Sequence, residues 1–382
     1  MPRFTAIEGL RAWLAWAVVA WHVVQFTGLA RADGPMTWFP AIGDSAVMVF
    51  VAISGFVIAG LVTGRAEPYP QYLVRRVFRI FPVYLVILMI AFFALPFGVW
   101  AEDHAPWKAD PLFYYDDVLH GHVDTLAGRP LQQAVLHLTL MQGVMPDSLW
   151  PNTSTAILGP AWSLSLEWQF YLVAPAFVWL VANPRFRMAT VAAVGLMGLA
   201  WHFDIFGDYI APSFLPAAAF VFLIGIASRL NFDRIRTMAI GPEVIPLLLA
   251  LGVIYRDGLW LAIWAAMLVY LARAEGWRST TGQPHPIAAA MDKLFASPIA
   301  AYLGARSYSV YLVHMPMMML VAWLMTGTLA LAETNARIMV GVGTVLATLA
   351  ASDLLYRFVE RPMIALGARL ARRRPTALQA AE

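Results

Sequence analysis

Residues 7–26 read IEGLRAWLAWAVVAWHVVQF, and this stretch decides the fold. It is apolar enough to enter a membrane, yet it contains Glu8, Arg11 and His22. Ionisable side chains inside a membrane span are costly and usually face a protein-lined or wet interior. Arg11 and His22 are about three helical turns apart, so both lie on one face, separated by about 16 Å along the axis. Glu8 lies one turn before Arg11 and can pair with it. The stretch therefore predicts a membrane helix with a polar stripe.

The composition predicts an all-α, polytopic membrane protein. The chain has 382 residues, of which 60% are hydrophobic and 13% charged, whereas about 25% are charged in a typical soluble domain. Several apolar runs reach the ~20 residues that a bilayer requires. The net charge of +3 gives no indication of nucleic-acid binding, and the absence of cysteine excludes disulfides, thiolate metal sites and a cysteine acyl carrier. A single Arg precedes the first apolar run without a small-residue cleavage site, which favours an uncleaved first span.

Loop charges predict how the chain crosses the membrane. The segment 131–146 is apolar but short, and the arginine-rich loops share one side only if it does not cross. We therefore expect an outer loop, 98–160, in which 131–146 is re-entrant or interfacial. Both termini would be cytoplasmic, with a ten-helix domain over 1–366 and a basic tail over 367–382. The ten expected spans are 7–28, 42–62, 78–98, 162–182, 187–203, 212–229, 239–255, 257–273, 299–325 and 335–360.

This topology predicts that His22 and Glu167 meet in the outer half of the bundle. Imidazole is the commonest general base near neutral pH, since its unperturbed pKa of ~6.5 leaves it mostly neutral there. A carboxylate beside the ring would orient it and stabilise its charged form. The pair would suit removal of a proton from a hydroxyl. The alternative is that His22 only donates an interhelical hydrogen bond and packs.

Three arginines, Arg75, Arg76 and Arg79, lie at the expected cytoplasmic entry of the third span. Guanidinium groups suit phosphate oxygens, although positive-inside topology and lipid headgroups explain most such clusters. The outer-loop histidines and aspartates match no strict ligand spacing, so we expect no metal site.

Six stretches together resemble the acyltransferase 3 family of bacterial membrane acyltransferases. They run in the family's order over nearly the whole chain: EGLR with His22, GDSAVMVFVAISGFVI (43–58), RRVFRIFPVY (75–84), WSLSLEWQFYL (162–172), LGARSYSVYLVHMP (303–316) and VERP (359–362). The chain departs from the family pattern at Glu8, where Asp is common, and at Trp168, where a second acidic residue is frequent. No extra hydrolase-like domain is expected after the last span.

The resemblance implies a membrane O-acyltransferase, with no permanently bound cofactor. It would move an acyl group, usually acetyl, from cytoplasmic acyl-CoA to a hydroxyl of a cell-envelope carbohydrate or lipid-linked glycan. It places catalysis at His22, with Glu167 and Arg11, and the CoA phosphates at Arg75, Arg76 and Arg79, again with Arg11. Whether His22 acts as a base or carries the acyl group stays open. Candidates for lining the channel are Glu8, Ser54, Tyr84, Trp162, Ser165, Tyr171, Tyr308 and His314.

The alternative class is a transporter or channel for a polar solute, because polar residues near mid-membrane also mark substrate paths. Transporters often show paired halves or broken helices in corresponding positions, and neither is evident in this sequence. The expected location is the bacterial inner membrane, with membrane lipids as partners and a homodimer left open.

Overall fold

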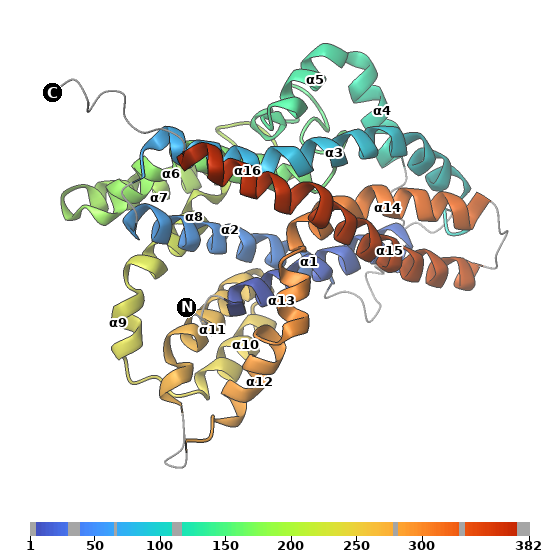
Figure 1. The fold of residues 1–382 in the computed structure, drawn as a ribbon. Coiled ribbons are helices and arrows are strands. Elements are labelled where there is room, and N and C mark those ends of the chain that lie inside the picture. The colour runs from blue at the N-terminus through green and yellow to red at the C-terminus, as the bar shows by residue number, and fades with distance from the viewer. Residues whose placement is uncertain are drawn as a thin grey trace.

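The computed structural model describes residues 5–29, 39–64, 67–108, 117–277, 282–327 and 333–372. These residues form helices and turns, with no β-strand among them. Long helices run side by side and make up the main bundle, and α9 to α13 form a second group beside α1 (Figure 1). The α-helices are α1 (Thr5–Phe26), α2 (Phe39–Gly64), α3 (Tyr69–His104), α4 (Val118–Gly128), α5 (Pro130–Leu138), α6 (Ala161–Ala182), α7 (Pro184–His202), α8 (Leu215–Leu230), α9 (Phe232–Thr237), α10 (Val244–Ile254), α11 (Leu259–Arg273), α12 (Pro286–Phe295), α13 (Pro298–Gly304), α14 (Ser307–Gly327), α15 (Glu333–Leu355) and α16 (Arg361–Arg372).

Seven helical segments among the described residues are long and apolar enough to cross a membrane. They confirm an all-helical, multi-pass membrane protein. Helices α8 and α10 are apolar but shorter, and α7 corresponds to the expected span 187–203 without belonging to the seven. The number of ten spans and the cytoplasmic termini therefore stay predictions.

Three expected spans differ from the observed helices. The third, 78–98, lies inside the 36-residue α3, which continues through Pro82 and Pro96; membrane helices tolerate proline where neighbouring groups satisfy the freed carbonyls. The ninth, 299–325, is broken at residues 305–306 into α13 and α14. The last continues through a π-helical turn, Tyr356–Glu360, into α16. The expected domain boundary at 366 thus falls inside a helix.

The segment 131–146 contains α5 and a 3-10 turn, Gln142–Val144. Helix α5 has nine residues, too few to span a bilayer. Helices α4 and α5 project from the bundle beside α3 (Figure 1). Leu131 is 73% exposed, and Val135 and Leu138 are each 53% exposed. An exposed apolar face on a short helix is compatible with the interfacial placement predicted for this segment.

Small residues allow close helix crossings around the polar stripe. A Cβ on Gly55 of α2 would lie 2.4 Å from the Phe222 carbonyl oxygen, and one on Gly225 of α8 would lie 2.1 Å from the Ala52 carbonyl oxygen. Membrane helices commonly use small residues in this way, because backbones can then approach closely. Helix α1 contacts α2, α13 and α14, so its polar stripe is enclosed by protein on several sides.

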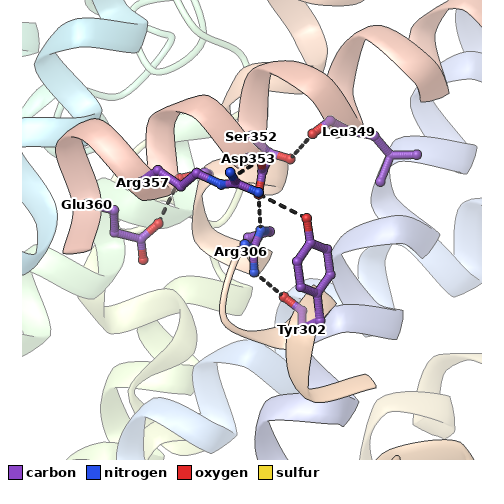
Figure 2. A network of polar contacts seen from close by, with 8 residues as sticks. Tyr302, Arg306, Leu349, Ser352, Asp353, Arg357 and Glu360 are labelled. Carbon is purple, nitrogen blue, oxygen red and sulfur yellow. Dashed lines mark hydrogen bonds and ion pairs between the residues drawn. The ribbon is translucent and has the colours of Figure 1, made fainter. Parts of the chain in front are cut away.

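A polar network holds the break between α13 and α14 against the π-helical turn (Figure 2). Asp353 accepts hydrogen bonds from Arg306 Nε at 2.8 Å, Arg357 Nε at 2.8 Å and the Tyr302 hydroxyl at 2.9 Å. The Arg306 guanidinium also stacks 3.5 Å above the Tyr302 ring. The network joins the break, which lies directly before α14, to α15 and to the π-helical turn. Helix α14 carries Tyr308, Tyr311 and His314.

Candidate functional site

The polar stripe of α1 opens into two separate cavities. The first has a volume of about 230 Å³ and lies between α1, α2, α3, α6 and α14. We name it the arginine cavity, after Arg11, Arg76 and Arg79. Its other polar lining residues are Glu8, Ser54, Ser163, Glu167, Tyr171, Ser307, Tyr308 and Tyr311.

Glu167 is held within the arginine cavity by α2 and by its own helix. Its Oε1 accepts a hydrogen bond from Ser54 Oγ at 2.7 Å and another from the Tyr171 hydroxyl. The Arg76 guanidinium lies 5.6 Å from the centroid of the Tyr171 ring. Two hydrogen-bond donors and a nearby cation thus hold this carboxyl group in place.

Two arginines of this cavity carry unused donors. Nε of Arg11 and Nε of Arg76 are buried and have no hydrogen-bond partner among the described residues. Arg75, by contrast, binds Glu67 at 2.5 Å and does not line the cavity. Of the predicted phosphate ligands, the structure therefore brings together Arg11, Arg76 and Arg79, and it places Arg75 elsewhere.

A second carboxylate lies deep beside the same arginines. Glu360, 3% exposed, is the last residue of the π-helical turn and accepts a hydrogen bond from Ser309 Oγ at 2.7 Å. Arg11 and Arg79 are among its charged neighbours. Glu360 is the second residue of the VERP stretch, which the sequence places at the cytoplasmic end of the last expected span. The carboxyl groups of Glu167 and Glu360 thus lie among the buried arginines of this cavity, where groups of opposite charge offset the cost of burial.

The second cavity, which we name the histidine cavity, contains His22. It has a volume of about 410 Å³. Trp21, His22 and Gln25 of α1 line one side, with Trp162 of α6 among the other lining residues. Its remaining polar lining residues are Asp44, Asp117, His122, Asn152 and Thr155. Sequence reasoning did not single out Gln25 or Asp44 as site residues, although Gln25 lies one turn beyond His22 on the same helix. It considered Asp117 only among the outer-loop residues that lack the spacing of a metal site.

Two side chains of α14 lie between the cavities. The rings of His22 and His314 stack, with centroids 5.2 Å apart and planes inclined at 28°. His314 is fully buried and lies 6.2 Å from the ring of Tyr311, which lines the arginine cavity. His314 Nε2 has no hydrogen-bond partner among the described residues. A line of three rings thus connects the two cavities.

The expected pairing of His22 with Glu167 is absent from the described residues. Glu167 lines the arginine cavity with Ser54 and Tyr171, whereas His22 lines the histidine cavity against His314. The two residues were matched by depth along the bundle axis, but depth does not determine which way a side chain points about its own helix.

Two of the expected channel-lining residues are structural anchors. Ser165 is fully buried, donates to the Leu140 carbonyl at 2.7 Å and accepts from Gly143 N at 3.1 Å. The Tyr84 hydroxyl donates to the His137 carbonyl at 2.7 Å. Neither lines either cavity. They attach the 131–146 segment to α6 and α3, because buried backbone groups there need partners.

Two buried histidines support the wall formed by α4 and α5. His122 lies 3.2 Å from Thr155 Oγ1, and His137 is fully buried on α5. Burial lowers the pKa of His122 to about 4. Burial, with His122 nearby, lowers the pKa of His137 to about 3. Both rings are therefore neutral near pH 7.

The sequence of this all-helical membrane protein matches a known family. A family model described as an acyltransferase domain matches residues 4–357. The chain therefore belongs to the acyltransferase 3 family.

Two relatives extend the comparison. Peptidoglycan O-acetyltransferase OatA of Listeria monocytogenes is 24% identical over 397 aligned residues, which cover 94% of this chain and 55% of that protein. Acyltransferase MdmB of Streptomyces mycarofaciens is 26% identical over 406 aligned residues, which cover 98% of this chain and 94% of that protein. The chain thus spans about half the length of OatA and nearly all of MdmB. No solved structure matches it.

Proposed function

We propose that the protein is a membrane O-acyltransferase that moves an acyl group from acyl-CoA to the hydroxyl of an acceptor, by chemistry centred on His22. The observation that carries this proposal is that a single helix contributes lining residues to both cavities. Arg11 of α1 faces the arginine cavity, and His22 of the same helix faces the histidine cavity. Membership of the acyltransferase 3 family and the similarity to OatA and MdmB support acyl transfer.

The arginine cavity suits an anionic donor such as acyl-CoA. The unpartnered Nε groups of Arg11 and Arg76 can donate to phosphate oxygens. Arg79 adds a third cation to the same cavity. The positive-inside pattern predicts that this end of the bundle faces the cytoplasm, where acyl-CoA is made. The thioester arm would then extend past Tyr311 toward the His22–His314 pair.

The histidine cavity suits the acceptor. In the proposed step, a neutral His22 removes the proton from the acceptor hydroxyl while its oxygen attacks the thioester carbonyl carbon. The carbon–sulfur bond breaks, an ester forms, and the proton passes from His22 to the departing CoA thiolate. If His22 carried the acyl group instead, an acyl-imidazole would form first and the hydroxyl would then attack it.

Purified protein in nanodiscs provides the test. Incubated with radiolabelled acetyl-CoA and an oligosaccharide, it should release CoA and label the sugar. Arg76→Gln should raise the KM for acetyl-CoA, whereas His22→Gln should abolish labelling and keep acetyl-CoA binding. Arg185→Gln, a substitution at the start of α7 outside both cavities, is the matched control. Full labelling by His22→Gln, or solute transport in liposomes without CoA consumption, would overturn the proposal.

A further inference from the structure

The two cavities differ in charge. Arg11, Arg76 and Arg79 line the arginine cavity, whereas none of the described residues that line the histidine cavity is Lys or Arg. The charged residues of the histidine cavity are instead two aspartates, Asp44 and Asp117. Both are exposed, so they lie where a ligand enters. An anion would meet two carboxylates and no arginine or lysine from these residues, and like charges repel it.

The histidine cavity also presents an unused hydrogen-bond acceptor. Gln25 is 7% exposed and lines the cavity next to the His22 ring, with which its side chain interacts. Its Oε1 has no hydrogen-bond partner within 3.5 Å among the described residues. Asp117 begins α4 with a φ of 59°, and its side chain does not cap that helix. An aspartate at this position usually accepts a hydrogen bond from the first helical turn. Both side chains thus offer oxygen acceptors that hydroxyl and ammonium donors can fill.

Two tryptophans provide flat apolar surfaces beside these acceptors. Trp21 and Trp162 both line the histidine cavity. A Cβ on Gly43 would lie 2.4 Å from Trp21 Cδ1, so glycine is needed there for the indole to lie against α2. Indole faces attract cations and pack against apolar ring faces. Acidic oxygens beside indole faces suit a ligand that is rich in hydroxyls and carries an amine.

We propose that the histidine cavity selects its acceptor by charge. It takes hydroxyl-rich molecules that are amine-bearing or neutral, in that order of affinity, and it rejects those bearing carboxylate or phosphate. Asp44 and Asp117 provide this selection, and Gln25 accepts a hydrogen bond from the bound molecule. The inference depends on the proposed function only in calling the bound molecule an acceptor. The binding preference itself follows from the charges of the cavity.

The test measures binding without acyl-CoA. Tryptophan fluorescence of the protein in nanodiscs is titrated with three trisaccharides: the amine-bearing glucosamine trimer, its neutral N-acetylated form, and anionic trigalacturonate, at a pH where the amines are protonated. The glucosamine trimer should bind at least tenfold more tightly than trigalacturonate. Asp44→Asn and Asp117→Asn should each reduce that ratio by about fivefold, the scale of one exposed charge pair. Asp124→Asn, an exposed change on α4 outside the cavity, should leave it unchanged.

Three outcomes would overturn the inference: equal affinity for all three sugars, binding of none of them, or a ratio that the two asparagine variants leave intact. Both variants are nearly isosteric, and size-exclusion profiles of the nanodiscs check that they fold. A second measurement uses salt, because the preference should shrink as ionic strength rises.

Acyl transfer is then measured separately on the same preparations. If the sugars bind with the expected preference but acetyl-CoA neither binds nor releases CoA, the proposed function fails and the charge-selective site stands. If acetyl-CoA is consumed and a sugar is labelled without any charge preference, the inference fails and the proposed function stands.

Discussion

His22 and His314 stack face to face with ring centroids 5.2 Å apart, although 292 positions separate them in the sequence. His22 borders the histidine cavity, and His314 is fully buried behind it, next to Tyr311 of the arginine cavity. His314 therefore lies where the proposed donor and acceptor paths meet. A second imidazole stacked on the first can hold that ring in one orientation. The dipole of its ring can also stabilise the positive charge that His22 gains when it takes a proton.

This relationship predicts that His314 acts on turnover through His22. His314→Phe keeps a ring for stacking but removes both nitrogens, so kcat should fall by at least tenfold while the KM for acetyl-CoA stays unchanged. General acid–base groups typically contribute about 10²–10⁴-fold, and a positioning residue contributes part of that. Labelling kinetics in nanodiscs measure both constants. His104→Phe, at the exposed end of α3, is the control. Full activity of His314→Phe would assign His314 to packing alone.

The two adjacent arginines of α3 should behave differently. Arg76→Gln should raise the KM for acetyl-CoA by about 10–100-fold, because that factor corresponds to the free energy of one charge-assisted hydrogen bond. Arg75→Gln should change it far less, because Arg75 already binds Glu67 at 2.5 Å and lies outside the cavity. Initial rates over a range of acetyl-CoA concentrations compare the two variants. Equal effects would show that Arg75 leaves Glu67 when the donor binds.

The crossing of α2 and α8 should not tolerate a side chain at Gly225. A Cβ there would lie 2.1 Å from the Ala52 carbonyl oxygen, so Gly225→Ala must push the two helices apart. We expect loss of folded protein, seen as a reduced monodisperse peak in fluorescence-detected chromatography. Gly195→Ala on α7 is the matched control, since nothing lies within 4 Å of its added Cβ. That control should be neutral or stabilising by about 0.5–1 kcal/mol, as in a helix interior. A folded, stable Gly225→Ala protein would contradict this packing.

The network around Asp353 should contribute measurably to thermal stability. Asp353→Asn weakens contacts with Arg306, Arg357 and Tyr302 together (Figure 2). The side chain of Arg306 is only 10% exposed, and its charge would lose its carboxylate partner. We therefore expect a lower Tm in differential scanning fluorimetry. Asp233→Asn, which affects an exposed ion pair with 3.8 Å between its charged atoms, should leave Tm nearly unchanged. Equal effects of the two substitutions would argue against a role for the network.

Stability should decrease as pH falls from about 7 toward 4. Burial lowers the pKa of His122 to about 4 and that of His137 to about 3. In the unfolded chain both would titrate near 6.5. Between these values the unfolded state binds more protons, so the free energy of unfolding drops as pH is lowered.

The double substitution of His122→Gln and His137→Gln should flatten this dependence, as measured by Tm at several pH values. A matched His202→Gln, at an exposed position of α7, should leave the slope unchanged. An unaltered slope in the double variant would show that other groups dominate the acid sensitivity.

Much of this architecture could be predicted from local patterns. Apolar runs of about 20 residues identified most of the long helices, because the bilayer requires that length. Helical periodicity placed Arg11 and His22 on one face of α1. In the structure Arg11 lines the arginine cavity and His22 lines the histidine cavity. The observed helices differ most from the expected spans at two places. One is the break at residues 305–306, and the other is the π-helical turn that carries the last span beyond residue 360. Arg306 stabilises that break through Asp353, 47 positions away, so no local pattern reports it.

The sequence by itself determined the membrane class, the helices and the polar stripe of α1, because hydropathy and helical period are properties of neighbouring residues. Only the tertiary structure decided which partner each polar side chain meets. Glu167 turns toward Ser54 and Tyr171, His22 stacks on His314, and the stripe opens into two cavities of different charge. The physical reason is that these contacts depend on the rotation of each helix about its own axis. That rotation is set by packing against helices distant in sequence, at close crossings such as Gly55 and Gly225.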